Sequence, residues 1–169
     1  MTNFKVKIRF MEKGDLDAVH AIEVKSFGEH HWSKESFANE LSNGYARYFV
    51  ALNEWDEIIA YVGMWHILDE AHVSTLSVSP DYRGKSVGEA LLNRLLQYCY
   101  DNMIKYITLE VRVSNVGAIR LYEKYGMKSL GTRKGYYQDN NEDAHIMWSE
   151  NIFYDRYKEL FAKVSGELV

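Results

Sequence analysis

The stretch of this chain that most constrains its fold is 76–92, which reads LSVSPDYRGKSVGEALL. It begins with an alternating apolar segment and a proline, and it continues with a loop that contains two glycines and an apolar helical repeat. This order predicts a strand, a turn, a loop and a helix. The start of a helix exposes unpaired backbone N–H groups and the positive end of the helix dipole. Because Arg83 and Lys85 add positive charge to a loop of small residues, the stretch is suited to hold a phosphate. A charged, solvated connection between a strand and a helix explains the same residues equally well.

The spacing of this loop excludes two common nucleotide fingerprints. No Lys-Ser or Lys-Thr pair follows the last glycine, Gly88, as it does in the G-x-x-x-x-G-K-S/T loop that binds nucleoside triphosphates. The loop does not match G-x-G-x-x-G either. A nucleotide-binding protein is therefore the weakest of the functions that a phosphate-holding loop would allow.

Size and composition are those of one soluble globular domain. The 169 residues are 47% hydrophobic and 26% charged, and they are enough to bury a sizeable core. The net charge of −4 gives no basic field that would attract nucleic acid, and it mildly suits a cationic substrate such as an amine. No apolar run approaches the ~20 residues that a membrane-spanning helix needs. We therefore expect neither a nucleic-acid nor a membrane partner.

Two further features favour a reducing, cytoplasmic location. The single cysteine, Cys99, cannot form a disulfide within the chain, and its place in an apolar helical pattern predicts a buried structural thiol. The N-terminal stretch 1–9 lacks the apolar core of a signal peptide.

Hydrophobic periodicity predicts a mixed α/β fold. Alternating runs indicate strands at 6–11, 48–52, 58–67, 72–79, 106–112, 127–133 and 143–148. Helical repeats with capping residues indicate helices at 15–26, 33–42, 87–102, 115–125 and 152–164. This order predicts a central sheet of about seven strands flanked by helices, with one extra helix at the C-terminus.

Two local details are predicted as well. Asp15 should cap the first helix through its side chain. The apolar side of that helix should be formed by Leu16, Val19, Ile22 and Val24. The alternation of the strand at 72–79 breaks near 75–76, which indicates a β-bulge.

A second informative run is 109–127, which reads LEVRVSNVGAIRLYEKYGM. Its strand part should turn the odd-numbered residues toward the core, which leaves Glu110 on the opposite face. Asn115 is suited to cap the helix that follows, and Gly126 is suited to end it.

Both runs resemble segments of the GNAT superfamily of N-acetyltransferases. The loop 83–88 is similar to the family's R/Q-x-x-G-x-G/A loop, which grips the pyrophosphate of acetyl-CoA. The run 109–127 looks very like the matching block of the protein N-terminal acetyltransferases, which include the RimI-type alanine enzymes and archaeal relatives. Shorter matches follow in the family's order at 32–33, 68–71, 135–137 and 142–144. The resemblance spans 6–149, roughly.

The loop departs from the family pattern at one position. Arg83 opens the motif and Gly88 closes it, but Ser86 stands where the family usually has glycine. If this position needs a positive φ, serine costs about 1 kcal/mol of strain, and a Ser86→Gly variant should bind CoA more tightly. The serine hydroxyl could instead donate a hydrogen bond to a phosphate. The departure concerns affinity for the coenzyme more than its identity.

The resemblance implies transfer of an acetyl group from acetyl-CoA to a free α-amine by direct attack. An α-amine has a pKa of ~8, so roughly a tenth of it is neutral at pH 7 and only modest help from a base is needed. The resemblance places the family's general base, acting through a water, at Glu110. From periodicity alone, Glu110 reads instead as a surface glutamate on the polar face of a strand.

The resemblance also implies a general acid and a coenzyme site. Tyr122 would protonate the departing thiolate, although its helical position also fits plain core packing. Asn115 would contact CoA, cap its helix, or do both. Backbone groups of 76–78 would pair with the pantetheine arm and steady the oxyanion. The implied acetyl-CoA site comprises Leu76, Ser77, Val78, Arg83, Gly84, Lys85, Ser86, Val87, Gly88, Glu89, Asn115, Tyr122 and Lys124.

The acceptor side rests on the same resemblance. The residues implied to bind the substrate are Glu29, His30, Trp32, His72, Glu110, Tyr136 and Tyr137. For Glu29, His30, Trp32, Tyr136 and Tyr137, a solvated loop rich in aromatic residues is an equally good reading of each one singly. His66, His72 and Glu110 match no recognised set of metal ligands, and no metal is expected.

The sequence therefore predicts a GNAT acetyltransferase domain at 1–150 and a C-terminal helical extension at 151–169. Its expected substrate is a protein N-terminus, with the ribosome or nascent chains as partners and a monomer or homodimer as the assembly. Acetylation of lysine or of a small-molecule amine is the alternative within the same chemistry. A non-catalytic CoA-binding module is the alternative from another class, although the chain keeps both Glu110 and Tyr122.

Overall fold

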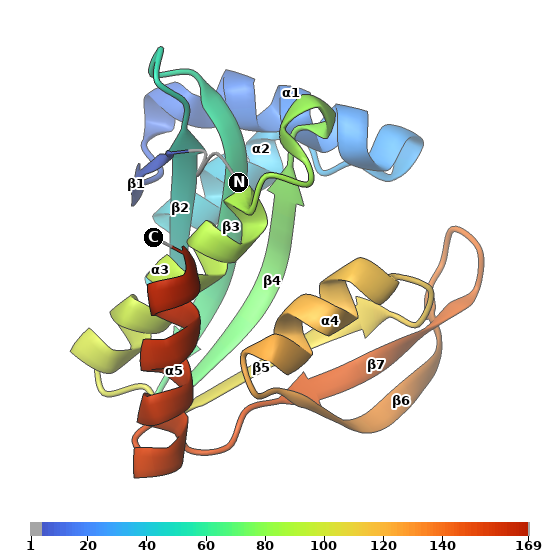
Figure 1. The fold of residues 1–169 in the computed structure, drawn as a ribbon. Coiled ribbons are helices and arrows are strands. Elements are labelled where there is room, and N and C mark those ends of the chain that lie inside the picture. Colours follow the sequence, from blue (N-terminus) through green and yellow to red (C-terminus); the bar gives the residue numbers. More distant parts are fainter. Residues whose placement is uncertain (1–4, 169) are drawn as a thin grey trace.

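The centre of the molecule is a sheet with the strand order β1-β2-β3-β4-β5-β7-β6 (Figure 1). The computed structural model describes residues 5–168, and within them the sheet has seven strands. The strands are β1 Lys7–Phe10, β2 Ala46–Leu52, β3 Ile58–Ile67, β4 Glu70–Val78, β5 Tyr106–Arg112, β6 Lys128–Tyr137 and β7 Glu142–Trp148. Neighbouring strands are antiparallel except β4 and β5, which run parallel. The predicted mixed α/β fold is confirmed.

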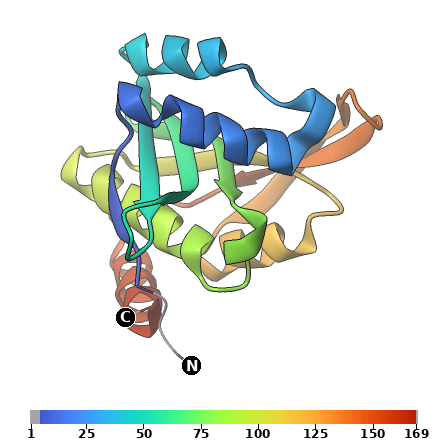
Figure 2. The same cartoon turned by 90° about the horizontal axis from the view of Figure 1, so that it is seen from above.

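Helices cover both faces of this sheet (Figure 2). One face carries α1 Leu16–Phe27 and α2 Lys34–Ser42, and the other carries α3 Val87–Asp101, α4 Val116–Lys124 and α5 Asp155–Leu168. Each face has its own buried apolar cluster, one against α1 and α2 and one against the other three helices.

The two halves of the sheet separate between β4 and β5. Within the described residues these strands pair only through 70–73 and 106–109. Ser74 is the extra residue of a β-bulge, and it allows Leu76 to face the same core as Val73. Beyond the bulge the second half of β4 diverges from β5 (Figure 1). The predicted bulge is therefore confirmed, slightly earlier in the strand than expected.

Helix α1 buries a carboxylate in place of an expected apolar residue. Leu16, Val19 and Ile22 are buried as predicted. Val24 is 39% exposed, whereas the side chain before it, Glu23, is 3% exposed. Glu23 stands two turns after Leu16 and thus on the same side of the helix, while Val24 is rotated away. The assignment of Val24 to the apolar side was wrong for this reason.

Asp15 stands at the N-cap position of α1 but does not cap it with its side chain. Its carboxylate accepts hydrogen bonds from the Glu12 amide at 2.7 Å and from the Arg9 guanidinium at 2.7 and 3.0 Å. The hydrogen bond from Arg9 lowers the pKa of Asp15. The residue therefore closes the turn before the helix, and the predicted partner was wrong.

Strand β6 is longer than the run 127–133 that its alternation predicted. It continues to Tyr137 through an irregularity around Gly135, which has a φ of +60°. The strand rejoins β7 where Tyr137 pairs with Glu142. The two tyrosines predicted for a loop thus lie at the end of a strand.

The C-terminal helix α5 is anchored to the rest of the molecule. Tyr157 is 2% exposed, and its hydroxyl donates to the Tyr125 carbonyl at 2.7 Å. The helix begins at Asp155, three residues later than predicted, because Asn151 closes a turn. The Asn151 side chain accepts a hydrogen bond from the Phe153 amide at 2.9 Å.

Residues 1–4 and 169 lie outside the described part. The outer ends of the predicted segments 1–150 and 151–169, and the first part of the stretch 1–9, therefore fall beyond it. Between 5 and 168 no helix combines the length and apolar character needed to span a bilayer. Cys99 is buried as predicted, and burial raises the pKa of its thiol to about 12.

Gly63 in β3 marks a close contact inside the sheet. A Cβ placed there would lie 2.2–2.7 Å from ring atoms of Tyr48, which is itself 3% exposed. We expect Gly63→Ala to lower the free energy of unfolding by about 3 kcal/mol, because the buried ring has to move. Urea denaturation measures this, with Gly166→Ala, whose added Cβ meets nothing within 4 Å, as the control. Wild-type stability in Gly63→Ala would mean that the Tyr48 ring shifts freely.

Candidate active site

Glu110 lies just beyond the last paired residues of β4 and β5. Its side chain is 12% exposed, and one carboxylate oxygen is 2.7 Å from His72 Nε2. The other oxygen is 3.7 Å from the Arg133 guanidinium. The prediction that Glu110 points away from the core is confirmed by the burial pattern of β5. His66, the third residue considered with these two, instead packs its ring against Tyr98.

Arg133 is a neighbour of Glu110 that the sequence analysis missed. It comes from β6, the edge strand, and pairs with Ala144 of β7. Its approach to Glu110 depends on the register of β6, which shifts between Ser129 and Gly131. No local sequence pattern fixes such a shift, so only the tertiary structure brings Arg133 to the site.

Tyr122 on α4 has a buried ring and an accessible hydroxyl. The residue is 6% exposed, and burial, with a smaller effect of Tyr137, raises the pKa of its hydroxyl to about 12. No hydrogen bond joins this hydroxyl to another described residue. Among residues 5–168, every fully buried side-chain nitrogen or oxygen has a hydrogen-bond partner, so an unpaired hydroxyl such as that of Tyr122 is not fully buried. The hydroxyl therefore keeps a small contact with solvent and carries its proton at neutral pH.

The segment 79–86 leads from β4 into α3, and we call it the coenzyme loop. Gly84 and Ser86 have φ angles of +74° and +64°, so the backbone turns twice through the left-handed region. The Arg83 amide donates to Pro80 O, and the first helical bond runs from the Ala90 amide to Ser86 O. The N–H groups of the first turn of α3 thus have no carbonyl in the helix to bond.

These donors fit a diphosphate group. The first turn of α3, at 87–89, supplies backbone N–H groups and the positive end of a 15-residue helix. A Cβ at Gly88 would already touch Val78 at 3.5 Å, so the loop packs closely on β4. Lys85, whose ammonium lies 5.4 Å from the centre of the Tyr82 ring, adds positive charge beside the loop.

Several residues predicted to contact the coenzyme are engaged with the protein itself. The Arg83 side chain donates to the Val78 carbonyl at 3.0 Å. Lys124 and Glu89 form an ion pair with a separation of 2.9 Å. Asn115 caps α4, as predicted, by accepting from the Ala118 amide at 3.2 Å. On β4, Ser77 is buried whereas Leu76 and Val78 are half-buried.

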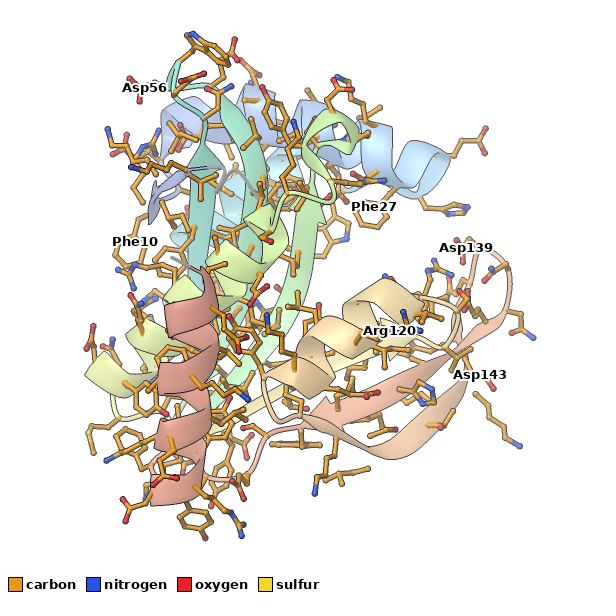
Figure 3. All side chains as sticks on the ribbon, viewed as in Figure 1. Phe10, Phe27, Asp56, Arg120, Asp139 and Asp143 are labelled. Carbon is orange, nitrogen blue, oxygen red and sulfur yellow. The ribbon has the colours of Figure 1, made fainter. Side chains whose placement is uncertain are left out.

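The residues predicted to bind the acceptor come from the two halves of the molecule. Residues 28–32, which we call the acceptor loop, follow α1, and the turn between β6 and β7 belongs to the half of the sheet that begins with β5. Figure 3 shows Phe27 at the end of α1 and Asp139 in that turn, on the two sides of the separation between the halves. Glu29 and His30 are exposed, and Trp32 is 38% exposed.

The charge of Asp139 reflects this placement. Partial desolvation is the largest single effect and raises the pKa of Asp139, but the hydrogen bonds from Arg112 and the Asn140 amide, together with the charges of Arg112 and His30, lower it overall. His30 of the acceptor loop is therefore close enough to the turn between β6 and β7 to influence it electrostatically.

Arg112 organises the two tyrosines on that side. Its guanidinium lies 3.9 Å from the centre of the Tyr137 ring and 2.8 Å from Asp139. The Tyr136 and Tyr137 rings meet edge to face at 5.0 Å. Burial raises the pKa of Tyr137 to about 12. Tyr136, which is 44% exposed, presents an aromatic surface to solvent.

The family model described as "Acetyltransferase (GNAT) family" matches residues 16–127, a segment that includes both Glu110 and the coenzyme loop.

The chain belongs to the GNAT family.

Relatives of this GNAT chain resemble it both in sequence and in structure. A Bacillus subtilis (strain 168) protein, provisionally named ribosomal protein bS18-alanine N-acetyltransferase, is 42% identical over 85% of this chain and 95% of its own length. The Escherichia coli (strain K12) protein named ribosomal protein bS18-alanine N-acetyltransferase is 34% identical over 83% of this chain and 94% of its own. The crystal structure of the ribosomal-protein-S18-alanine N-acetyltransferase from Escherichia coli superimposes with a TM-score of 0.79 at 32% identity. That superposition covers 87% of this chain and 94% of that one. This GNAT protein is an acetyl-CoA-dependent N-acetyltransferase.

Ser86 occupies the left-handed conformation that a glycine would favour, with a φ of +64°. Strain that Ser86 carries equally in the free and the bound loop does not change the affinity for CoA, because binding depends on the difference between the two states. We therefore expect Ser86→Gly to bind CoA no more tightly than the wild type, contrary to the expectation from the sequence. Its stability should stay within about 0.5 kcal/mol, because relieved strain and lost backbone rigidity nearly cancel. Calorimetric titration with CoA is the measurement, and tighter binding would show that the free loop leaves this conformation.

Proposed function

We propose that this N-acetyltransferase moves the acetyl group of acetyl-CoA to the free α-amino group at the N-terminus of a protein. The observation that carries the proposal is the Glu110 carboxylate, 12% exposed where β4 and β5 stop pairing, with His72 Nε2 at 2.7 Å. Relatives at 42% and 34% identity that are named ribosomal protein bS18-alanine N-acetyltransferases support a protein substrate.

We assign Glu110 the role of general base. An amine attacks only in its neutral form, and an α-amine with a pKa of ~8 is neutral far more often at pH 7 than a lysine with a pKa of ~10.4. A carboxylate that acts through one water can take the remaining proton. His72 holds one carboxylate oxygen at 2.7 Å and so fixes the orientation of this base.

We assign Tyr122 the role of general acid. Acetyl-CoA supplies the acetyl group as a thioester, so the leaving thiolate needs a proton. The Tyr122 hydroxyl has no hydrogen-bond partner among the described residues and, with a pKa of about 12, keeps its proton at neutral pH. Backbone N–H groups of β4 beyond the bulge, at 76–78, would donate to the thioester oxygen as negative charge develops there.

Binding of the two substrates follows from the same arrangement. The first turn of α3 and the coenzyme loop would hold the pyrophosphate, with the free edge of β4 along the pantetheine arm. The acceptor loop and the aromatic pair Tyr136 and Tyr137 would hold the first residues of the peptide. The ribosome or a nascent chain would present such a peptide in the cytoplasm.

A panel of acceptors tests the proposal. Acetyl transfer is measured for short peptides with free Ala, Ser, Gly or Met N-termini, for an N-blocked peptide with an internal lysine, and for a small diamine. Turnover confined to the free N-termini is the expected result. Faster turnover of the lysine peptide or of the diamine would replace the proposed substrate class. Acetyl-CoA binding without turnover of any acceptor would indicate a non-catalytic module.

A further inference from the structure

The buried carboxylate of Glu23 has no charged partner. It is 3% exposed, and none of the ion pairs among residues 5–168 includes it. One oxygen accepts a hydrogen bond from the Tyr61 hydroxyl of β3, and the other accepts one from the Trp32 amide at 3.1 Å. A buried glutamate without a cation is costly, so its two donors are what hold it there.

The bond to Trp32 fixes the end of the acceptor loop. Trp32 follows a single turn of 3-10 helix at Gly28–His30, and its ring packs 5.5 Å from Phe37 of α2. The loop residues Glu29 and His30 are exposed and bury no side chain in the core. The Glu23 carboxylate is therefore a buried polar anchor for the loop, beside the packing of the Trp32 ring on Phe37.

One turn further along α1, Ser26 makes a second set of contacts. Its hydroxyl lies 2.7 Å from the hydroxyl of Ser77 on β4 and accepts a hydrogen bond from the Arg83 guanidinium at 3.3 Å. Arg83 also donates to the Val78 carbonyl at 3.0 Å. The end of α1 is thus joined to the second half of β4 and to the coenzyme loop at once.

We propose that Glu23 and Ser26 are positioning residues that set the two substrate sites relative to each other. Glu23 orients the acceptor loop, and Ser26 orients the coenzyme loop, both from the last two turns of one rigid helix. Because the reacting atoms must meet within a few tenths of an ångström of a productive geometry, a common support for the two loops favours transfer. This inference rests on the proposed function for the identity of the acceptor.

The coenzyme half is tested without any acceptor. Ser26→Ala removes the hydroxyl that joins β4 to Arg83, and we expect it to weaken CoA binding in calorimetric titration by about two- to ten-fold. Ser26→Thr keeps the hydroxyl and should restore binding to within about two-fold. Ser42→Ala, which removes a serine hydroxyl from the end of α2, is the matched control and should leave CoA binding unchanged.

The acceptor half is tested by kinetics with the best peptide of the panel. Glu23→Ala removes the acceptor of both hydrogen bonds, and we expect the KM for the peptide to rise about ten-fold while the Kd for CoA stays within two-fold. Glu23→Gln keeps one acceptor oxygen and should recover part of the affinity. If Glu23→Ala does not fold, Glu23→Gln alone carries the test, with Glu35→Gln at an exposed glutamate of α2 as its control.

Selective effects support the inference and uniform effects overturn it. Unchanged CoA binding in Ser26→Ala, or equal shifts of both ligands in the Ser26 and Glu23 variants, would show that these residues only stabilise the fold. A wild-type enzyme that acetylates no N-terminal peptide would overturn the proposed function together with the acceptor half. The coenzyme half is decided by calorimetry in either case.

Discussion

Replacing Glu110 with glutamine should lower kcat/KM for an N-terminal peptide by about 10²- to 10⁴-fold, the contribution typical of a general base. The amide keeps the shape of the side chain and can still bond His72, which lies 2.7 Å from the carboxylate. It cannot take a proton from the attacking amine. The loss should be steepest at low pH, where most of the α-amine is protonated, and should shrink as the pH approaches the amine pKa of ~8. A pH–rate profile of both proteins from pH 6 to 9 measures this.

Two comparisons keep this result specific to the base. Glu35→Gln, at an exposed glutamate of α2, should leave the profile unchanged. CoA binding of Glu110→Gln should equal that of the wild type, because the coenzyme loop is remote from the carboxylate in sequence and on another strand end. A parallel profile, lowered by the same factor at every pH, would remove Glu110 from proton transfer and leave it a structural role.

Replacing Tyr122 with phenylalanine should lower kcat by about 10²-fold without changing the affinity for CoA. The ring, which is buried with the residue 6% exposed, keeps its packing. The lost hydroxyl carries its proton at neutral pH, since burial raises its pKa to about 12. The leaving thiolate must then take its proton from water. Single-turnover acetyl transfer, together with calorimetric titration of CoA, separates the chemical step from binding.

The stability of the Tyr122→Phe protein shows whether the hydroxyl has a structural role. The hydroxyl makes no hydrogen bond to another described residue, so its removal should shift the free energy of unfolding by less than about 0.5 kcal/mol. A large loss of stability would mean that the hydroxyl has a structural partner. A kcat equal to that of the wild type would assign Tyr122 to the core alone.

Much of the fold can be predicted because burying one face of a strand or helix leaves a hydrophobic pattern in its sequence. The strand at 106–112 was predicted with its observed bounds because one of its faces is buried and the other is not. The helix α4 was delimited by Asn115 and Gly126, whose chemistry suits the start and end of a helix. Glu110 and Tyr122 themselves were singled out by resemblance, since periodicity alone described a surface glutamate and a core tyrosine.

What the sequence did not predict depends on contacts between distant elements. Arg133 approaches Glu110 only because β6 is shifted against β7. Glu23 is buried because Tyr61 of β3 and the Trp32 amide meet its carboxylate, and neither is near it in helical spacing. The contact of Arg83 with the end of α1 is of the same kind, because its guanidinium donates to the Ser26 hydroxyl from a distant part of the chain. Propensity and periodicity carry no information about such pairs.

The single extra residue at Ser74 has a consequence for how substrate meets the enzyme. The bulge lies where β4 stops pairing with β5, so the second half of β4 has an extended edge that pairs with no described residue of β5. An extended ligand that adds to this edge meets backbone groups that are already aligned. The conformational entropy of ordering β4 is therefore lost on folding and not again each time a ligand binds.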